Sequence, residues 1–338
     1  MSKIVFFTDP HVSGKTPAAR LDNYPETILG KIRQVGEIAK EINADAVICG
    51  GDWFDRPDVG PNIVGRLGAI LSGFTCDIFT VIGNHDVYGY NAATVTRSML
   101  GILSGFGIVK RLTNDIPFIV GDFALSGVDA AYELDRDGRV IDYTDGPKEE
   151  GKINVRVLHS FLDTKDWPDF VAVTNIYNLP PLNSDIILTG HEHTGYGKIV
   201  HGGTTYINPG ALGRVTASVG DVNKVVQVCI LESHEGTDFT VTFRKLDYAP
   251  AEEVIDRDRL LREKEALRSR EKFLSTLANS NVLGDLATVE SFNIYNALAD
   301  LAAADDIPPK VVKLVQNLLA TAEEEAAGSK LGEDDERR

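Results

Sequence analysis

The sequence predicts an α/β fold built around a parallel sheet, followed by a smaller all-helical region. Three observations predict it. Apolar runs typical of strands alternate with segments of helical periodicity through the first 106 residues. From about residue 107 onward, strand-like runs follow one another, separated by Gly, Asp and Asn turns. After residue 250 nearly every segment has the periodicity of a helix.

The first half is expected to form three strand–helix units. The predicted strands cover 3–9, 46–52 and 77–86, and the predicted helices cover 24–42, 61–74 and 92–106. In the helix over 24–42, Ile28, Ile32 and Val35 share one face, and the helix over 61–74 has a proline at its start. This alternation indicates parallel strands covered by helices.

The second half is expected to add a more antiparallel sheet. Its predicted strands lie within 117–129, 154–162, 185–193, 204–212 and 224–233, and the polar stretch 131–152 is expected to be a surface hairpin or loop. We therefore predict a core over 1–249, a helical accessory region over 250–327, and an acidic tail over 328–338 that is disordered by its composition.

Composition limits the possible function. The formal net charge of −16 argues against nucleic-acid binding by electrostatics alone, so that bound cations, a local basic strip or a partner would have to supply the attraction. The sequence has no apolar run long enough to span a membrane, and the apolar start is too short for a signal-peptide core. Three scattered cysteines, Cys49, Cys76 and Cys229, are typical of free thiols in a reducing compartment. We expect a cytoplasmic protein without membrane contact.

Polar residues with metal-binding side chains follow most of the predicted strands. They are Asp9 and His11 in "TDPH", Asp52 and Asp55 in "GGDWFD", Asn84 and His85 in "GNHD", His159 in "VLHS", and His191 and His193 in "TGHEH". Each pattern alone also fits a turn or a surface pair. Because the carboxyl ends of parallel strands meet at one edge of a sheet, their joint occurrence predicts a single site.

The chemistry of these residues indicates a hydrolytic metal centre. Carboxylate, amide and imidazole groups without thiolates suit Mn²⁺, Fe or Zn²⁺ in catalysis better than a structural zinc. Seven ligands are too many for one tetrahedral ion but fit two ions roughly 3.5–4 Å apart that share a bridging carboxylate. Asn84 would give its amide oxygen to a metal, while His85 would contact phosphate or protonate a leaving oxygen. Asp86 fits helix capping equally well.

These five motifs resemble the calcineurin-like metallophosphoesterase signature, D-x-H, G-D-x-x-D, G-N-H-D/E, H and G-H-x-H, in order over residues 9–193. The resemblance implies an αββα sandwich with two metals at the sheet edge. It assigns Asp9, His11, Asp52 and His193 to one metal, and Asp52, Asn84, His159 and His191 to the other. It also implies that Asp52 bridges the metals, that His85 is the acid that contacts phosphate, and that Asp55 orients a ligand histidine.

Within that superfamily the chain is most similar to the nuclease subunit of SbcCD-type DNA repair complexes, especially compact phage-type versions. The similarity lies in "TDPHVSG", in the second motif running into a helix, in the fifth motif with its following hairpin, and in a helical segment after the core. It implies a Mn²⁺-dependent DNA exo- or endonuclease, with Mg²⁺, Fe or Zn²⁺ as other metals. It further implies a homodimer and an SbcC-type ATPase docked on the C-terminal helices, in the host cytoplasm if the protein is phage-encoded.

The sequence also departs from this pattern and leaves alternatives open. The segment after the core is short, the chain is acidic, and "HSF" replaces the usual His-Gly of the fourth motif. A small-molecule or cyclic-nucleotide phosphodiesterase or phosphatase, or a scaffold with a decayed site, would share this signature. Arg214 could contact substrate phosphate or form a surface salt bridge, and Trp167 could shape the rim of the site or anchor a loop from within. The helices over 61–74 and 92–106 could form a dimer face or simply cover the sheet.

Overall fold

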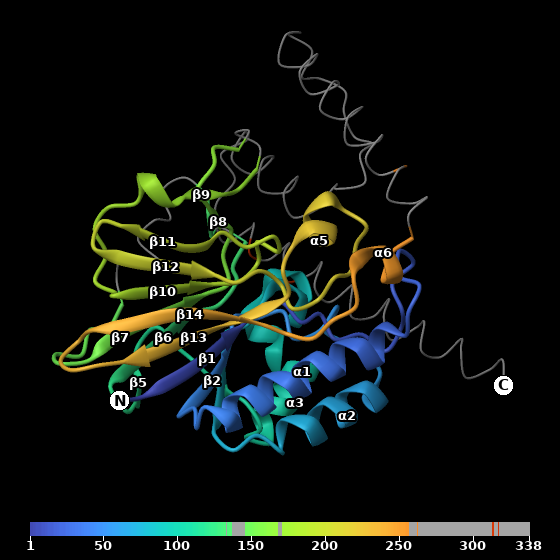
Figure 1. Cartoon of the computed structure of the whole chain (residues 1–338), viewed down its shortest axis with the longest axis horizontal. Coiled ribbons are helices and arrows are strands. Elements are labelled where there is room, and N and C mark those ends of the chain that lie inside the picture. The colour runs from blue at the N-terminus through green and yellow to red at the C-terminus, as the bar shows by residue number, and fades with distance from the viewer. Residues whose placement is uncertain are drawn as a thin grey trace, which may run out of the picture.

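The computed structural model describes residues 1–132, 134–136, 146–167 and 171–256, together with residues 262, 313 and 317. Two six-stranded sheets pack face to face, with helices against the first (Figure 1). The first sheet has the order β14-β13-β1-β2-β3-β4 and the second the order β11-β12-β10-β7-β6-β5. The α/β fold class predicted from the sequence is confirmed.

The bounds of the elements are as follows. The first sheet contains β1 (Lys3–Phe7), β2 (Ala46–Cys49), β3 (Asp77–Thr80), β4 (Lys110–Arg111), β13 (Gln227–Ser233) and β14 (Phe239–Lys245). The second contains β5 (Phe118–Val120), β6 (Phe123–Val128), β7 (Ile153–Leu158), β10 (Ile186–Thr189), β11 (Gly197–His201) and β12 (Thr204–Asn208), and β8 (Leu162–Asp163) pairs with β9 (Thr174–Asn175). The helices are α1 (Tyr24–Glu41), α2 (Pro61–Leu71), α3 (Met99–Gly105), α5 (Val219–Asn223) and α6 (Ala251–Val254), with 3₁₀ helices η1 (Asn84–Asp86), η2 (Tyr88–Tyr90), η3 (Ala92–Arg97) and η4 (Ile176–Asn178).

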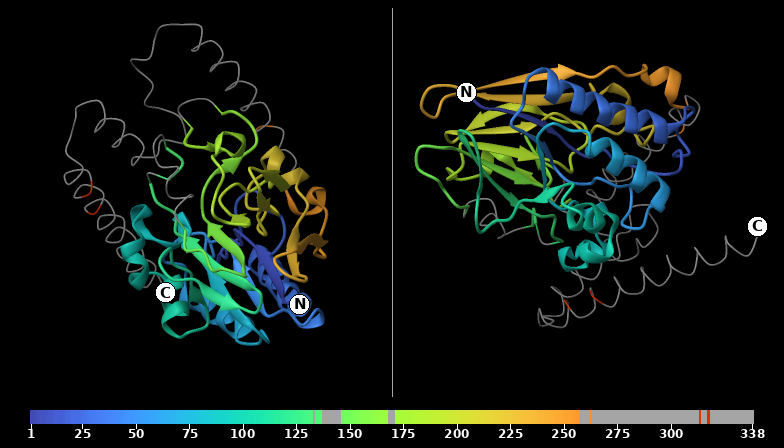
Figure 2. Two further views of the ribbon diagram at one scale, coloured as in Figure 1. Left: turned by 90° about the vertical axis from the view of Figure 1, so that its left-hand side faces the viewer. Right: turned by 90° about the horizontal axis from the view of Figure 1, so that it is seen from below.

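Alternation along the buried strands produces the layers. In β1, Val5 and Phe7 pack with the apolar faces of α1 and α2, whereas Ile4 and Phe6 pack between the two sheets. Successive side chains of a strand point to opposite faces, so a strand buried on both sides must be apolar throughout. Figure 2 shows the two sheets with α1, α2 and α3 on the outer side of the first. The core therefore forms two apolar layers, one on each face of the first sheet.

The second sheet differs from the antiparallel one that we expected. Its inner strands β12, β10, β7 and β6 run parallel, and only the outer pairs β11–β12 and β5–β6 are antiparallel. Strands β13 and β14, also from the second half, extend the first sheet instead, with β13 antiparallel to β1. Cys229 and Leu231 of β13 fill the layer between the sheets, which explains this placement. Both sheets thus present parallel strand ends.

The expected helix over 92–106 is two elements. Ser98 has an extended backbone, with φ −107° and ψ 167°, between η3 and α3. Its hydroxyl accepts a hydrogen bond from the backbone N–H of Gly101 and so caps α3. Because a serine can bond to the nearby backbone in this way, it begins a new helix rather than continuing one.

The predictions for the C-terminal part of the chain mostly concern residues that the structure does not describe. Apart from residues 250–256 and three isolated positions, the predicted helical region over 250–327 and the tail over 328–338 lie outside the described residues, as do residues 133 and 137–145 of the predicted 131–152 loop. In the part of the chain that the structure describes, no helix is long and apolar enough to cross a membrane.

Candidate metal centre

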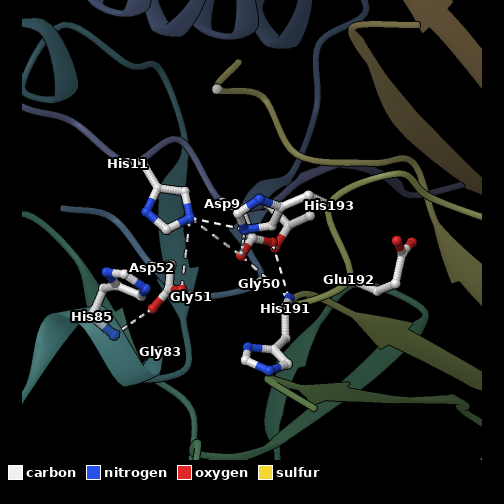
Figure 3. Close-up of polar contacts among 12 residues, drawn as sticks. Asp9, His11, Gly50, Gly51, Asp52, Gly83, His85, His191, Glu192 and His193 are labelled. Carbon is white, nitrogen blue, oxygen red and sulfur yellow. Dashed lines mark hydrogen bonds and ion pairs between the residues drawn. The ribbon is translucent and has the colours of Figure 1, made fainter. Parts of the chain in front are cut away.

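The predicted ligands come together at one edge of the two sheets. Asp9 and His11 follow β1, Asp52 follows β2, Asn84 and His85 follow β3, His159 follows β7, and His191 and His193 follow β10. All five strands end at this edge because they run parallel within their sheets. Figure 3 shows the resulting cluster around Asp9 and Asp52.

Asp9, His11 and His193 form one group of donors. Nε2 of His11 lies 3.0 Å from Nε2 of His193, and Oδ1 of Asp9 lies 3.8 Å and 3.5 Å from these two nitrogens. All three ligand atoms lie within 4.8 Å of one another. Two imidazole nitrogens and a carboxylate oxygen that converge on one point match the ligands of a divalent transition metal.

Asp52, His159 and His191 form a second group of donors, also within 4.8 Å of one another. Nε2 of His159 lies 3.3 Å from Oδ2 of Asp52 and 3.0 Å from Oδ1 of Asn84. Nδ1 of His159 lies 2.8 Å from the carbonyl oxygen of Gly50, which can only accept a hydrogen bond. The proton of the neutral ring therefore belongs on Nδ1, and Nε2 presents its lone pair to the site, as a metal ligand requires.

Asp52, a member of the second group, also faces the first. Its Oδ2 also lies 3.7 Å from Nε2 of His11, and Asp52, His11 and His85 form a third set of converging donors. Burial of a carboxylate among imidazoles is costly unless opposite charge compensates it. The residues present therefore fit divalent cations, and two cations that share Asp52 remain the prediction made from the sequence.

Without cations, the pKa values of the histidines differ widely. Burial and the neighbouring His193 lower the pKa of His11 to about 3, and burial together with His159 lowers the pKa of His191 to about 4. Burial opposes protonation of His159 as well, but the Asp52 carboxylate prevails and raises its pKa to about 10. His11 and His191 are thus neutral near pH 7, while His159 supplies the positive charge that Asp52 needs.

Backbone strain concentrates at the same residues. Asp9, His11, Asp52 and His191 all have positive φ, between 45° and 73°. A left-handed conformation costs roughly 1–3 kcal/mol for a residue other than glycine, and it persists only where the surroundings enforce it. The N–H of Asp9 donates to the carbonyl of Gly51 and that of His11 to the carbonyl of Asp52, so each strand end fixes the next.

A close contact with Asp52 requires a glycine at position 83, directly before Asn84. A Cβ at Gly83 would overlap the carboxylate and the backbone nitrogen of Asp52. The close approach lets the N–H of His85 donate to Oδ1 of Asp52 over 2.8 Å. The motifs "GGD" and "GNHD" therefore meet directly, and Oδ2 of Asp52 remains directed at the histidines.

His85 stands at the accessible side of the cluster. Its side chain is exposed, and its Nδ1 lies 2.7 Å from the main-chain carbonyl oxygen of Asp55. Burial of part of the ring is outweighed by the charge of Asp52 and this carbonyl, which raise the pKa of His85. The contact of Asp55 with a histidine is thus made by its main chain, whereas the sequence led us to expect its carboxylate to orient one.

Comparisons with known proteins agree with this geometry. The model of the family described as calcineurin-like phosphoesterase matches residues 2–195. The chain belongs to this family. It is a hydrolase whose donor clusters indicate a metal-dependent phosphoesterase. A search of curated protein sequences finds no significant match.

Solved structures to which the chain is similar include two phosphatases and a phosphodiesterase. A dimetal phosphatase from Danio rerio is 14% identical, with a TM-score of 0.45, and the alignment covers 72% of this chain and 96% of that one. An archaeal phosphodiesterase is 15% identical, with a TM-score of 0.35 and coverage of 72% and 99%. A purple acid phosphatase from yellow lupin is 12% identical, with a TM-score of 0.40 and coverage of 72% and 51%.

Arg214 is not among the residues that this phosphoesterase brings together at the cluster. Its side chain is buried, it donates to the carbonyl oxygens of Lys224 and Ala249, and its guanidinium lies over the ring of Tyr248. These contacts tie the segment after β12 to the chain near 249. We therefore see a structural role for Arg214 in place of the phosphate contact considered from the sequence.

Asp86 has a local role. Its carboxylate accepts hydrogen bonds from the backbone N–H groups of Gly83 and Phe54, which closes the turn at η1. Burial and the charge of Asp52 raise its pKa to about 8. The capping role that the sequence allowed is the one the structure shows.

Two supporting residues escaped the sequence analysis. The hydroxyl of Thr8 donates to Oδ2 of Asp9 over 2.5 Å, and the hydroxyl of Tyr24 lies 3.1 Å from the carbonyl oxygens of both Pro10 and His11. Both orient the strained loop after β1. The threonine next to Asp9 was a visible signal, whereas nothing in the sequence indicates that Tyr24, the first residue of α1, reaches back to this loop.

Proposed function

We propose that this phosphoesterase hydrolyses phosphodiester bonds in DNA, as the nuclease subunit of an SbcCD-type complex. The observation that carries the phosphodiesterase part is Asp52, placed between two groups of donors with Oδ2 facing His11 and His159. A shared carboxylate is typical of two-metal sites that clamp the attacking and leaving oxygens of an in-line displacement. The likeness of "TDPHVSG", of the second motif with its following helix, and of the fifth motif with its following hairpin to the SbcCD-type nuclease subunit supports the nuclease assignment.

The accessible side of the cluster also supports a polymeric substrate. His85 is exposed, and the side chain of His193 is 33% exposed, so the donors reach the surface of the described structure. A DNA strand needs only to lie across such a site, whereas a small diester is usually held in an enclosing pocket.

When bound, divalent cations would lower the pKa of a water molecule and neutralise phosphate charge. Asp9, His11 and His193 would hold one cation; His159, His191 and Asn84 would hold the other, with Asp52 shared. His85 binds a phosphate oxygen or donates a proton to the leaving oxygen. The carbonyl of Asp55 fixes its Nδ1–H, so that Nε2 faces the substrate, and the bond between its backbone N–H and Asp52 sets its distance from the metal ligands.

Because the chain is acidic, its binding to DNA requires additional positive charge. With a formal net charge of −16, the chain repels a polyanion unless cations or a partner compensate. We propose that two Mn²⁺ ions supply local positive charge and that an SbcC-type ATPase, docked on the predicted C-terminal helices, supplies the wider DNA surface. In the same proposal the chain acts as a homodimer.

A paired assay on the Mn²⁺-loaded full chain tests the proposal. One arm offers linear single- and double-stranded DNA, and the other offers bis-(p-nitrophenyl) phosphate and cyclic nucleotides, with Asp52→Ala as the blank. We expect DNA cleavage that the variant lacks. Turnover of small diesters with intact DNA would instead favour the small-molecule phosphodiesterase, and equal activity in the variant would contradict both.

A further inference from the structure

The loop that follows His159 carries two aromatic side chains that continue outward from the metal centre. The ring of His191 lies 5.2 Å from that of His159, the ring of Phe161 lies 5.8 Å from that of His191, and the ring of Trp167 lies 5.2 Å from that of Phe161, each measured between centroids. These four rings form a continuous row that begins at two predicted metal ligands. Neither Phe161 nor Trp167 has a role in the metal chemistry described above.

Trp167 is exposed but firmly held. Its side chain is 42% exposed, and its Nε1–H donates to Oδ2 of Asp163 over 2.8 Å. Asp163 is itself buried and belongs to β8, which pairs with β9. An anchor that serves only to fix a loop would bury the ring, since burial of apolar surface is its source of stability. Here the polar edge of the indole is fixed while much of its surface remains open to solvent.

Phe161 is held by a second carboxylate. Its backbone N–H donates to Oδ2 of Asp135 over 2.7 Å, and Oδ1 of Asp135 accepts hydrogen bonds from the hydroxyls of Ser160 and Thr174. Hydrogen bonds therefore hold the loop between His159 and Trp167 to two other segments. A binding surface that is already ordered loses little conformational entropy when it binds a ligand.

We propose that Phe161 and Trp167 form a stacking subsite for a nucleobase next to the scissile phosphate. This inference rests on the proposed function and narrows its substrate to nucleotidyl diesters. The phosphate belongs at the metal cluster, and the base one sugar away would lie along the row of rings that starts at His191. Stacking on aromatic side chains tolerates every base, so the subsite would accept DNA without sequence preference.

A comparison of two oligonucleotides tests the subsite. One carries normal bases, and the other carries tetrahydrofuran abasic residues on both sides of the cleaved linkage. For Trp167→Ala we expect KM for the normal oligonucleotide to rise roughly ten- to hundredfold, with KM for the abasic one unchanged. Trp167→Phe should recover most of the affinity. Phe106→Ala, at a residue that is 78% exposed beyond α3, is the matched control and should behave as wild type.

Fluorescence separates failure of the subsite from failure of the nuclease. The chain has two tryptophans, and Trp53 is fully buried, so the difference between wild type and Trp167→Phe reports on Trp167. We expect dAMP to quench this difference signal and deoxyribose 5-phosphate to leave it unchanged, whether or not DNA is cleaved. Equal responses to the two ligands, or equal KM changes for the two oligonucleotides, would overturn the subsite.

Discussion

Oδ2 of Asp52 lies 3.3 Å from Nε2 of His159, and both side chains are almost completely buried. The same oxygen faces His11 on the other side, so a single atom connects the two groups of donors. Strands β1, β2 and β3 of the first sheet and β7 and β10 of the second supply these residues. The face-to-face packing of two sheets is thus what creates the site, since neither sheet alone holds a complete set of ligands.

His85→Asn should separate catalysis from metal binding. The asparagine keeps the backbone N–H that donates to Asp52 but removes the imidazole for which we propose a contact with phosphate. We expect kcat to fall by roughly 10²–10⁴-fold while metal content, measured by mass spectrometry on the same preparation, stays at the wild-type level. A variant that loses metal together with activity would place His85 among the ligands instead.

Gly83→Ala should disturb the cluster without changing any ligand. The added Cβ overlaps the carboxylate of Asp52, and relief of such overpacking typically costs about 1–3 kcal/mol. We expect weaker Mn²⁺ binding and a lower free energy of unfolding, measured by calorimetric titration and urea denaturation. Gly30→Ala is the control: a Cβ there meets no atom within 4 Å, and alanine favours helix α1. If both variants titrate like wild type, the close contact at Gly83 does not matter for binding.

Much of this architecture could be predicted because short stretches of the sequence specify it. The apolar strand followed by a polar motif is visible in the sequence at β1, β2, β3 and β10, and parallel strands bring their ends together. The pairing of β13 with β1 could not be predicted, because it depends on which layer Cys229 and Leu231 fill. The break at Ser98 and the role of the Asp55 carbonyl depend on backbone conformation, which residue types alone do not specify.

Acid should destabilise the folded protein, partly because Asp221 becomes protonated. Although burial opposes it, the ammonium group of Lys224, 2.6 Å away, lowers the pKa of Asp221 to about 2. A carboxyl group whose pKa is lower in the folded than in the unfolded state stabilises the fold at pH values above its unfolded-state pKa, which is about 4. That stabilisation is lost as the pH falls toward 2. Between pH 5 and pH 2.5, wild type should lose about 2 kcal/mol more than Asp221→Asn in urea-unfolding experiments. Equal losses in the two proteins would show that the pair contributes nothing.

Removal of metal should destabilise the fold as well as stop the reaction. The ligand atoms of each group lie within 4.8 Å of one another, and an ion that binds the folded chain alone raises its stability by mass action. Relative to the EDTA-treated protein, Mn²⁺ at a hundredfold excess over its dissociation constant should add about 2.7 kcal/mol per independent site. Differential scanning calorimetry would detect this as a higher melting temperature; an unchanged melting temperature would argue against a formed site.

The most direct test is the number of Mn²⁺ ions bound per chain, measured by equilibrium dialysis and elemental analysis. A site shared through Asp52 predicts two ions for wild type and reduced binding at both positions for Asp52→Asn. His234→Asn, which changes a half-buried histidine that contacts Thr240 away from the predicted ligands, should still bind two. One ion in wild type, or two ions retained by Asp52→Asn, would contradict the shared two-metal centre.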